Sequence, residues 1–415
     1  MIHSPQRGLS FARGAVFGAV AFALMSCGTS VAADLARWVN PFIGTQVGSG
    51  NTYPGAQVPF GMISWSPQTT DFGWSPSGYS YSNDRINGFG LIHLSGAGCS
   101  ITCELPFMPC TGPLDVAPTN RQAYSSAFFH TNETAEPGYY AVQLNTWNIR
   151  FENTVTARAG IAHLDFPSTS QANVVLNPNA DGVGLKDGAL YLDPTNRSIS
   201  GWVKSGSFCG VAGSEYVVYF VAQFDQPFTS FGTWKRSDKT PGSTSVSGPG
   251  LAAYMTFDSR RHQRVTMKTA ISFVSIANAK MNLAAEIPGW NFGKVKKAAR
   301  RQWNDQLNRI LVKGGDAGQT TIFYTALYHA LMLPSIFEDV NGEYRGMDDR
   351  VHHVAQGHHF MSTFSGWDTY RTQAQFWGWL YPEAASDVCS SFLAMARETE
   401  FKGGGGLPLW SLYND

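Results

Sequence analysis

The sequence has few charged residues and no excess of either sign. Lys and Arg total 30 of the 415 residues, Asp and Glu also total 30, and charged residues make up only 14%. Proteins that bind nucleic acid usually present a basic surface, so this balance argues against that class. Aromatic residues reach 13% and glycines number 43. Such a composition suits a neutral ligand such as a sugar, and equally a β-rich secreted protein with an aromatic core.

Long hydrophobic runs are also scarce, and the clearest one lies at the N-terminus. Arg7 and Arg13 precede the apolar run 14–25, and the small residues of "SVAAD" follow it. This order is typical of a signal peptide, which we expect to span residues 1–33. The run is too short to cross a membrane, and no later segment is expected to do so. We therefore predict a periplasmic or secreted bacterial protein. Alternatively, "LMSC" is a lipoprotein box that places a lipid anchor on Cys27.

Cysteine is rare, with 6 in the chain, and Cys27 is expected to leave with the signal peptide or to carry lipid. The others are a cluster and two distant residues: Cys99, Cys103 and Cys110, then Cys209 and Cys389. An exported protein could pair two members of the cluster, and the sequence leaves the connectivity open. The spacing lacks the paired C-x-x-C of a zinc site, so we expect no metal there.

The length exceeds one ordinary core and favours two domains. Residues 34–280 have the period of β-strands, with alternating apolar and polar residues in 139–151, 215–224 and 264–276. Clusters of Gly, Pro and Ser such as 240–250 separate the strands. Many short strands joined by turns predict an N-terminal β-sandwich domain.

The period then becomes helical. Within 281–312, which we expect to be a helical connector, apolar residues recur every four positions: Val295, Ala299, Trp303, Leu307 and Leu311. The basic residues of 294–301 lie largely off this stripe and indicate a solvated face.

Residues 313–415 are predicted to begin an all-helical domain. The segment 320–334 is apolar nearly all round, which indicates a buried helix that Pro334 ends. Apolar residues from Trp367 to Trp377 have helical spacing, and Pro382 is expected to open a further helix. Because three or four helices would have little to pack against, we interpret the chain as truncated.

Several long motifs occur in a fixed order along the mature chain. They occupy 39–62 ("VNPFIGTQVGSGNTYPGAQVPFGM"), 66–99, 320–348, 363–373 ("TFSGWDTYRTQ") and 403–415 ("GGGGLPLWSLYND"). In this order they resemble the signatures of family 92 glycoside hydrolases, the exo-acting α-mannosidases. The middle of the β-domain is similar only in pattern.

The resemblance implies a β-sandwich, connecting helices and an (α/α)6 barrel, here incomplete, with an active site between the two domains. It also implies a calcium-dependent, inverting enzyme that releases mannose from the non-reducing ends of α-mannosides or N-glycans. The uncharged loop 48–62 would then form one wall of a sugar pocket, where Gly and Pro fix turns. The alternative is a rigid loop at the edge of the sandwich without a role in ligand binding.

Three residues match the family's substrate contacts: Trp74, Trp367 and Asp368. The indole of Trp74 would stack on a sugar face, although Ser75 and Pro76 replace the usual Asp-Gly-Cys context. A carboxylate such as that of Asp368 can accept hydrogen bonds from two neighbouring hydroxyls, and such charge-assisted bonds are strong. The plainer interpretations are packing for the two tryptophans and a helix pair with Arg371 for Asp368.

Other polar residues receive structural interpretations. His93 is expected to be a hydrogen-bonded structural histidine, and Glu104 is assigned no role. The histidines of 351–359 ("VHHVAQGHH") suggest a metal hydrolase that uses His358 and His359, but adjacent histidines in a polar loop usually point apart.

An inverting glycosidase needs a general acid and a general base. None of the nearby carboxylates falls on the family's acid or base: Glu343, Asp348, Asp368 and Asp415. The resemblance places the acid, the base and most calcium ligands beyond residue 415. We therefore expect a fragment of an α-mannosidase that is inactive alone. The main alternative is a non-catalytic carbohydrate-binding protein.

Overall fold

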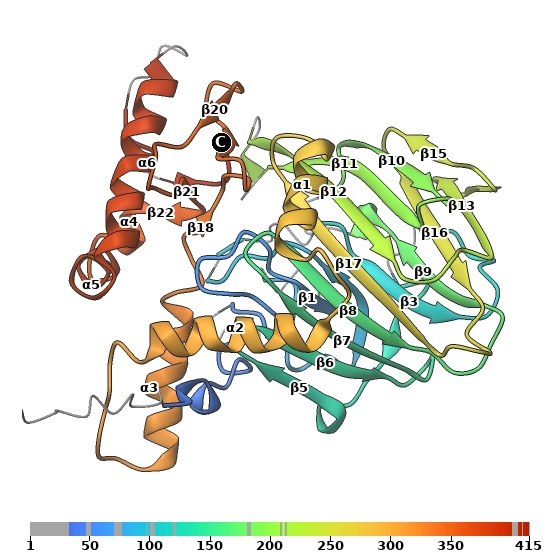
Figure 1. Cartoon of the computed structure of the whole chain (residues 1–415), viewed down its shortest axis with the longest axis horizontal. Coiled ribbons are helices and arrows are strands. Elements are labelled where there is room, and N and C mark those ends of the chain that lie inside the picture. The colour runs from blue at the N-terminus through green and yellow to red at the C-terminus, as the bar shows by residue number, and fades with distance from the viewer. Residues whose placement is uncertain are drawn as a thin grey trace, which may run out of the picture. The chain divides into compact units, whose positions relative to one another are not determined.

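The structure is a computed structural model, which describes residues 33–46, 51–69, 77–96, 98–99, 104–118, 122–180, 184–207, 210–211, 214–400, 406–408 and 410–414. Residues 33–415 form one compact unit, and the expected signal peptide, apart from its last residue Ala33, lies outside the described residues. Within that unit the chain forms β-sheets first and helices afterwards (Figure 1). Among the helices of these ranges, none combines the length and apolarity that a membrane crossing requires.

The described residues of the β region form two large antiparallel sheets. One has the order β1 (Ser66–Thr69), β2 (Arg85–Gly90), β3 (Phe107–Thr111), β9 (Ala172–Leu176), β16 (Leu251–Phe257), β13 (Ser230–Lys235) and β14 (Asp238–Pro241), with β4 (Ser126–Ala127) beside β2. The other has the order β15 (Ser245–Ser247), β10 (Asp187–Asp193), β11 (Ser198–Gly206), β12 (Glu215–Phe224), β17 (Arg264–Ser272), β8 (Ala159–Asp165), β7 (Ile149–Val155), β6 (Tyr139–Leu144) and β5 (Glu133–Glu136). Short 3₁₀ helices occur at η1 (Leu35–Trp38), η2 (His130–Asn132) and η3 (Pro178–Ala180).

Aromatic side chains join the inner faces of the two sheets. Phe89 of β2 stacks on Phe151 of β7 with 3.6 Å between ring centroids. Phe107 of β3 meets Phe220 of β12 edge to face at 6.3 Å. The burial of alternate residues along β11 and β12 matches the two-residue period that predicted these strands.

Helices cover the outer face of the nine-stranded sheet. The change from strands to helices occurs at Ser275, a few residues before the predicted boundary, where the Ser275 hydroxyl accepts a hydrogen bond from the Asn278 amide and begins α1 (Ile276–Glu286). α1 packs on β12 and β17, and α2 (Phe292–Leu307) packs on β7 and β8 (Figure 1). The predicted stripe of α2 is buried, except that Leu311 lies beyond the helix and is 66% exposed.

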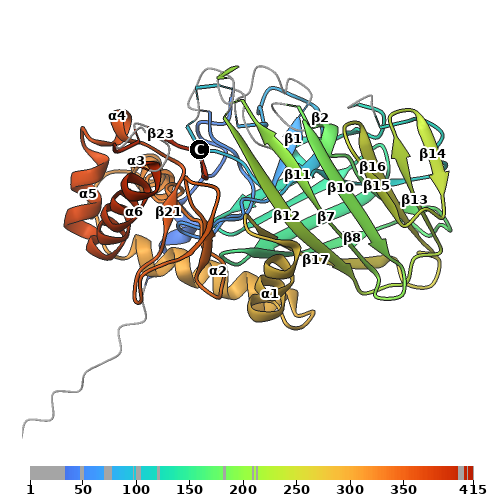
Figure 2. The same cartoon turned by 90° about the horizontal axis from the view of Figure 1, so that it is seen from above.

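The last part of the chain contains α3 (Ala317–His329), α4 (Gly366–Thr369), α5 (Gln373–Leu380) and α6 (Pro382–Glu400), beside one end of the β region (Figure 2). α3 ends before Pro334, and Ile322 is 63% exposed, so the predicted burial on all sides is wrong there. The spacing from Trp367 to Trp377 spans two helices, because the backbone of Thr372 leaves the helical conformation with ψ near −38° but φ near −144°. Pro382 opens α6 as predicted.

Three short strand pairs brace the loops between these helices. They are β18 (Ser335–Ile336) with β21 (Met361–Ser362), β19 (Glu343–Arg345) with β20 (Val351–His353), and β22 (Phe364–Ser365) with β23 (Trp410–Ser411). The (α/α)6 barrel remains a prediction of the resemblance.

Candidate functional site

The described part of the uncharged loop, residues 51–62, joins the β region to the helices. The Gln57 side-chain Nε2 donates to the Met332 carbonyl at 2.8 Å, and the Trp303 indole donates to the Gln57 backbone carbonyl at 2.6 Å. The Phe60 amide donates to the Leu331 carbonyl at 3.1 Å. Most of the loop is buried, so its polar backbone finds partners on α2 and just after α3 rather than in solvent.

Gly55 explains why part of this loop must be glycine. A Cβ atom at this position would lie 2.3 Å from the Ser66 Cα, far inside van der Waals contact. The loop therefore approaches β1 backbone to backbone, which only glycine permits. The rigid-loop interpretation describes this buried stretch, while Pro59 and Phe60 at its end line an adjacent pocket.

Asp368 lies exposed on the single turn α4. The Ser365 hydroxyl donates to its Oδ2 at 2.6 Å, while Oδ1 has no hydrogen-bond partner among the described residues. Ser365 belongs to β22 and pairs with Trp410 of β23. One carboxylate oxygen is thus held by the protein, and the other can accept hydrogen bonds from a ligand.

Trp410 is the strand partner of Ser365, three residues before Asp368. The side chain is 51% exposed, although the next residues, Ser411 to Asn414, are buried. The Ser411 hydroxyl lies 2.9 Å from the Ser362 hydroxyl, and the Tyr413 ring stacks on Phe273 at 4.5 Å. These buried contacts hold β23 and the residues after it in place, and so fix the position of the exposed Trp410. We call Asp368 and Trp410 the acid–indole edge.

The structure describes the three sequence-predicted contacts to different extents. Trp74 lies outside the described residues, and only the backbone of Trp367 is described, in α4. Asp368 is the one whose side chain is placed. Trp410 was not predicted as a contact, although it stands in the "LPLW" motif that carried the resemblance.

His93 is a buried structural residue, as predicted. Its Nδ1 lies 2.8 Å from the Ser64 carbonyl, which can only accept, so Nδ1 carries the hydrogen. Burial lowers the pKa of the imidazole to about 4, which keeps the ring neutral. Buried Glu104 accepts a hydrogen bond from the Tyr216 hydroxyl.

The histidines of 351–359 point apart, each toward its own carboxylate. The pairs are His352 with Asp348 (2.9 Å), His353 with Glu343 (3.7 Å), His358 with Asp387 (2.9 Å) and His359 with Glu338 (2.7 Å). Within the described ranges, no three His, Cys, Asp or Glu side chains converge as a metal site would require. The geometry gives the metal-hydrolase interpretation no support.

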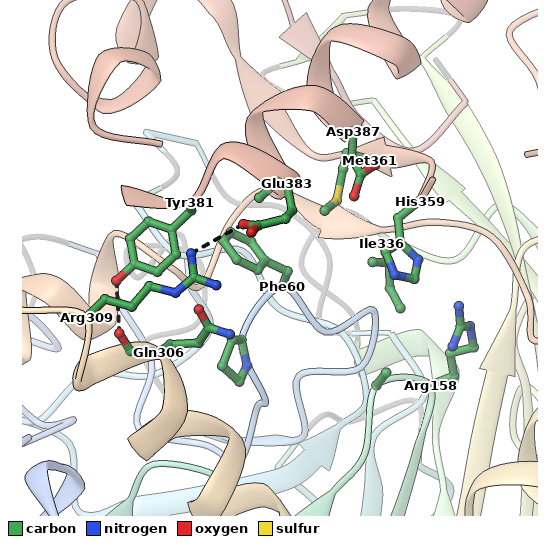
Figure 3. Close-up of a pocket in the computed structure, with 13 residues that line it drawn as sticks. Phe60, Arg158, Gln306, Arg309, Ile336, His359, Met361, Tyr381, Glu383 and Asp387 are labelled. Atoms are coloured by element: carbon green, nitrogen blue, oxygen red, sulfur yellow. Dashed lines mark hydrogen bonds and ion pairs between the residues drawn. The ribbon is translucent and has the colours of Figure 1, made fainter. Parts of the chain in front are cut away.

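A buried ion network lies where the β region meets the helices. Arg158 contacts Glu286 at 2.9 Å and Glu338 at 2.7 Å, and its Nε donates to the Glu338 carbonyl at 2.6 Å. The same Glu338 oxygen pairs with His359, which raises the pKa of that imidazole. Arg158 and His359 face the pocket shown in Figure 3.

Of the cysteines, Cys99 is disulfide-bonded, while Cys110 is a buried free thiol and Cys389 an exposed one. The partner of Cys99 lies outside the described residues, because both described alternatives are free.

The described chain thus combines two antiparallel sheets with helices, and the exposed residues Asp368 and Trp410 come near each other through the β22–β23 pair. Two family models together match most of the chain. The glycosyl hydrolase family 92 N-terminal domain matches residues 38–272, and the glycosyl hydrolase family 92 catalytic domain matches residues 278–415. The chain therefore belongs to glycosyl hydrolase family 92.

Solved structures and a curated protein are similar over most of the chain. The family GH92 α-mannosidase BT3965 of Bacteroides thetaiotaomicron superposes with a TM-score of 0.85 at 32% identity, covering 92% of this chain and 52% of that one. The inverting mannosidase BT2199 of the same organism gives 0.78 at 27% identity, covering 91% and 49%. A protein of Arthroderma benhamiae described as an uncharacterized secreted glycosidase is 26% identical over 86% of this chain and 47% of its own. The chain spans about half the length of these relatives.

Proposed function

We propose that the protein is an exo-acting α-mannosidase that releases mannose from the non-reducing ends of α-mannosides, with α-1,2 linkages or N-glycans as substrates. Membership of family 92 carries this proposal, together with the similarity to structures described as α-mannosidases. One of these, BT3965, is in complex with mannoimidazole in a second structure. The inverting stereochemistry is carried over from BT2199, which is described as an inverting mannosidase.

In this proposal the acid–indole edge binds the sugar. The free Oδ1 of Asp368 accepts hydrogen bonds from hydroxyls, while Oδ2 stays on Ser365 and fixes the orientation of the carboxylate. The exposed face of Trp410 lies against the C–H groups of the ring. Trp74 and Trp367 are proposed to add further aromatic contacts, as the resemblance implies.

Calcium is proposed as the cofactor of the family reaction, where it would supply a cation to the sugar hydroxyls. The described residues bring together no group of three His, Cys, Asp or Glu side chains that could hold it. We therefore assign calcium no ligand in this part of the molecule. Because no carboxylate of the chain matches the family's acid or base, the 415-residue chain is proposed to bind mannosides without cleaving them.

The binding proposal is tested by calorimetric titration of the chain with mannoimidazole. We expect Asp368→Asn to weaken binding by roughly tenfold or more, because a hydrogen bond to a charged group contributes about 1.5–3 kcal/mol. Asp305→Asn, which changes another exposed carboxylate, should leave the affinity unchanged. If the two variants bind mannoimidazole with the same affinity, Asp368 does not contribute to ligand binding.

Catalysis is tested separately by mannose release from an α-1,2-linked mannobiose, with an enzyme that cleaves this disaccharide as the positive control. We expect the 415-residue chain to release none and the natural protein purified from its source to release mannose. If the natural protein binds mannoimidazole without turnover, the non-catalytic carbohydrate-binding alternative holds instead. Turnover by the 415-residue chain would place the acid and base within it.

We propose that the protein is exported, because residues 1–33 have the pattern of a signal peptide. The relative from Arthroderma benhamiae is described as secreted, which supports this proposal. Mass spectrometry of the mature protein should find an N-terminus near Asp34, or a lipidated Cys27 if the alternative holds. An intact Met1 on the mature protein would contradict both.

A further inference from the structure

A separate pocket lies at the joint between the β region and the helices, with a volume of about 270 Å³. Its walls come from the end of the uncharged loop, the β7–β8 turn, the end of α2, the β18–β21 pair and the start of α6. Figure 3 shows Phe60, Tyr381 and Glu383 on one side of the space, with His359 and Arg158 on the other. A ligand there would contact every element of the joint at once.

The cations of this pocket are already neutralised. Arg158 pairs with Glu286 and Glu338, and His359 shares the Glu338 carboxylate. Arg309 donates to the Leu380 carbonyl at 2.5 Å and lies 3.3 Å from Glu383. An anion would gain little from such paired cations and would meet the Asp387 carboxylate, so the pocket disfavours phosphate or sulfate.

The groups left over suit a ligand with hydroxyls. Asp387 is 7% exposed and its Oδ1 binds His358 at 2.9 Å, while Oδ2 has no hydrogen-bond partner among the described residues. Glu383, one helical turn before Asp387 in α6, offers a second carboxylate, of which Oε2 lies 3.3 Å from Arg309. These acceptors match hydroxyl donors, as the free oxygen of Asp368 does at the acid–indole edge.

Part of the pocket lining is apolar. It consists of the Phe60 and Tyr381 rings with Ile336 and Met361. Phe60 is held rigidly, because its amide donates to the Leu331 carbonyl and its carbonyl accepts from the Ile336 amide at 2.9 Å. Fixed aromatic and apolar surfaces beside carboxylate acceptors suit a ring that has hydroxyls on its edge and C–H groups on its face.

We propose that this pocket is a second carbohydrate site, distinct from the acid–indole edge, that binds one neutral monosaccharide unit. Its volume lies just below the range of drug-sized ligand pockets, which suits a single pyranose ring rather than an oligosaccharide. The site has no catalytic role: it binds a sugar at the joint and stabilises the contact between the β region and the helices.

The test uses the full chain labelled with ¹³C-methyl methionine and titrated with methyl α-D-mannopyranoside. The Met361 methyl, which lines the pocket, is assigned by its loss in Met361→Leu. We expect its NMR signal to shift saturably with a Kd on the order of 1 mM, the affinity typical of so small a ligand. The methyl of Met395, fully buried elsewhere in α6, should stay in place.

Matched variants identify the groups responsible. Asp387→Ala should raise the Kd about tenfold or more, and Asp305→Ala should not change it. Phe60→Leu, which keeps an apolar side chain but removes the ring, should weaken binding with the fold retained. Asp368→Asn should leave the Met361 shift intact, which separates this site from the proposed function.

A Met361 signal that stays fixed at sugar concentrations far above that Kd would overturn the proposal. So would a sugar response unchanged in both Asp387→Ala and Phe60→Leu. A saturable shift with sodium phosphate in place of the sugar would show an anion site instead.

Discussion

His93 illustrates how burial makes one side chain sensitive to acid. Its pKa falls from 6.5 to about 4 in the folded protein, and its ring is fully buried. At pH values between about 4 and 6.5, His93 is protonated in the unfolded chain but neutral in the folded protein. The contribution of His93 to stability is therefore complete above pH 6.5 and is lost as the pH falls toward 4.

We expect His93→Asn to reduce the loss of stability between pH 7 and pH 5 by about 2 kcal/mol, because Asn can still donate to the Ser64 carbonyl but does not titrate. Urea unfolding at the two pH values measures this. His262→Asn, which changes an exposed histidine, is the control and should keep the wild-type pH dependence. An unchanged dependence in His93→Asn would mean that the ring is protonated in the fold.

Gly55 and Gly289 form a matched pair of glycines. A Cβ at Gly55 would lie 2.3 Å from the backbone Cα of Ser66, whereas a Cβ at Gly289 would meet nothing within 4 Å. Gly55→Ala should therefore prevent normal folding or lower the melting temperature strongly, since the backbone of β1 would have to move. Gly289→Ala should change the free energy of unfolding by less than about 1 kcal/mol, so its melting temperature should stay close to that of the wild type. Circular dichroism melts compare the two, and similar melts would show that the loop can relax.

The capping box of α3 gives a prediction for a single helix. The Asp316 side chain accepts from the Gln319 amide at 2.8 Å, and the Gln319 side chain accepts from the Asp316 amide at 3.0 Å. Asp316→Ala should cost about 1 kcal/mol of unfolding free energy, a typical value for a lost N-cap. Asp316→Asn, which keeps an acceptor, should cost much less. If both variants cost the same, the charge rather than the hydrogen bond stabilises the helix.

Elements whose period is local could be predicted from the sequence. The alternation of 215–224 gave β12, and the stripe from Val295 to Leu307 gave the buried face of α2. The break between α4 and α5 could not be predicted, because the apolar spacing continues through Thr372 while the backbone does not. In general, periodicity reports which side chains are buried, and tertiary contacts decide where the helix stops.

The candidate site was predictable only where a motif carried it. Asp368 came from the "WDT" motif, and its place on an exposed turn agrees with a role in ligand binding. The exposed presentation of Trp410 depends on its pairing with Ser365, which lies 45 residues earlier and leaves no local signal. The carboxylate partners of His358 and His359 could not be predicted from the sequence either. Asp387 comes from α6, and Glu338 follows β18, so both lie more than 20 residues away along the chain.

The Arg158 network links the two regions of the molecule and should dominate the strength of their joint. The side chains of Arg158 and Glu338 are only 10% and 3% exposed. Arg158→Met would leave Glu286 without its cation and Glu338 with His359 alone, at a cost of about 3–5 kcal/mol. Arg264→Met breaks an ion pair whose arginine is 50% exposed, and it should cost less than about 1 kcal/mol. Thermal denaturation compares them, and equal losses would mean that the buried network adds no stability beyond an exposed pair.

The uncharged loop is synthesised early but can reach its final partners only late. Gln57 binds Met332 and Trp303, which follow it by 275 and 246 residues. Closing so long a separation is slow, because the chain must lose much of its freedom before these contacts form. The strands around β1 can therefore pair while the loop still lacks its helical partners. During refolding, protection of the Phe60 amide from hydrogen exchange should appear together with the ordering of α2 and α3, later than protection of β11 and β12. The most N-terminal signature of the family would then mark the completion of folding rather than its start.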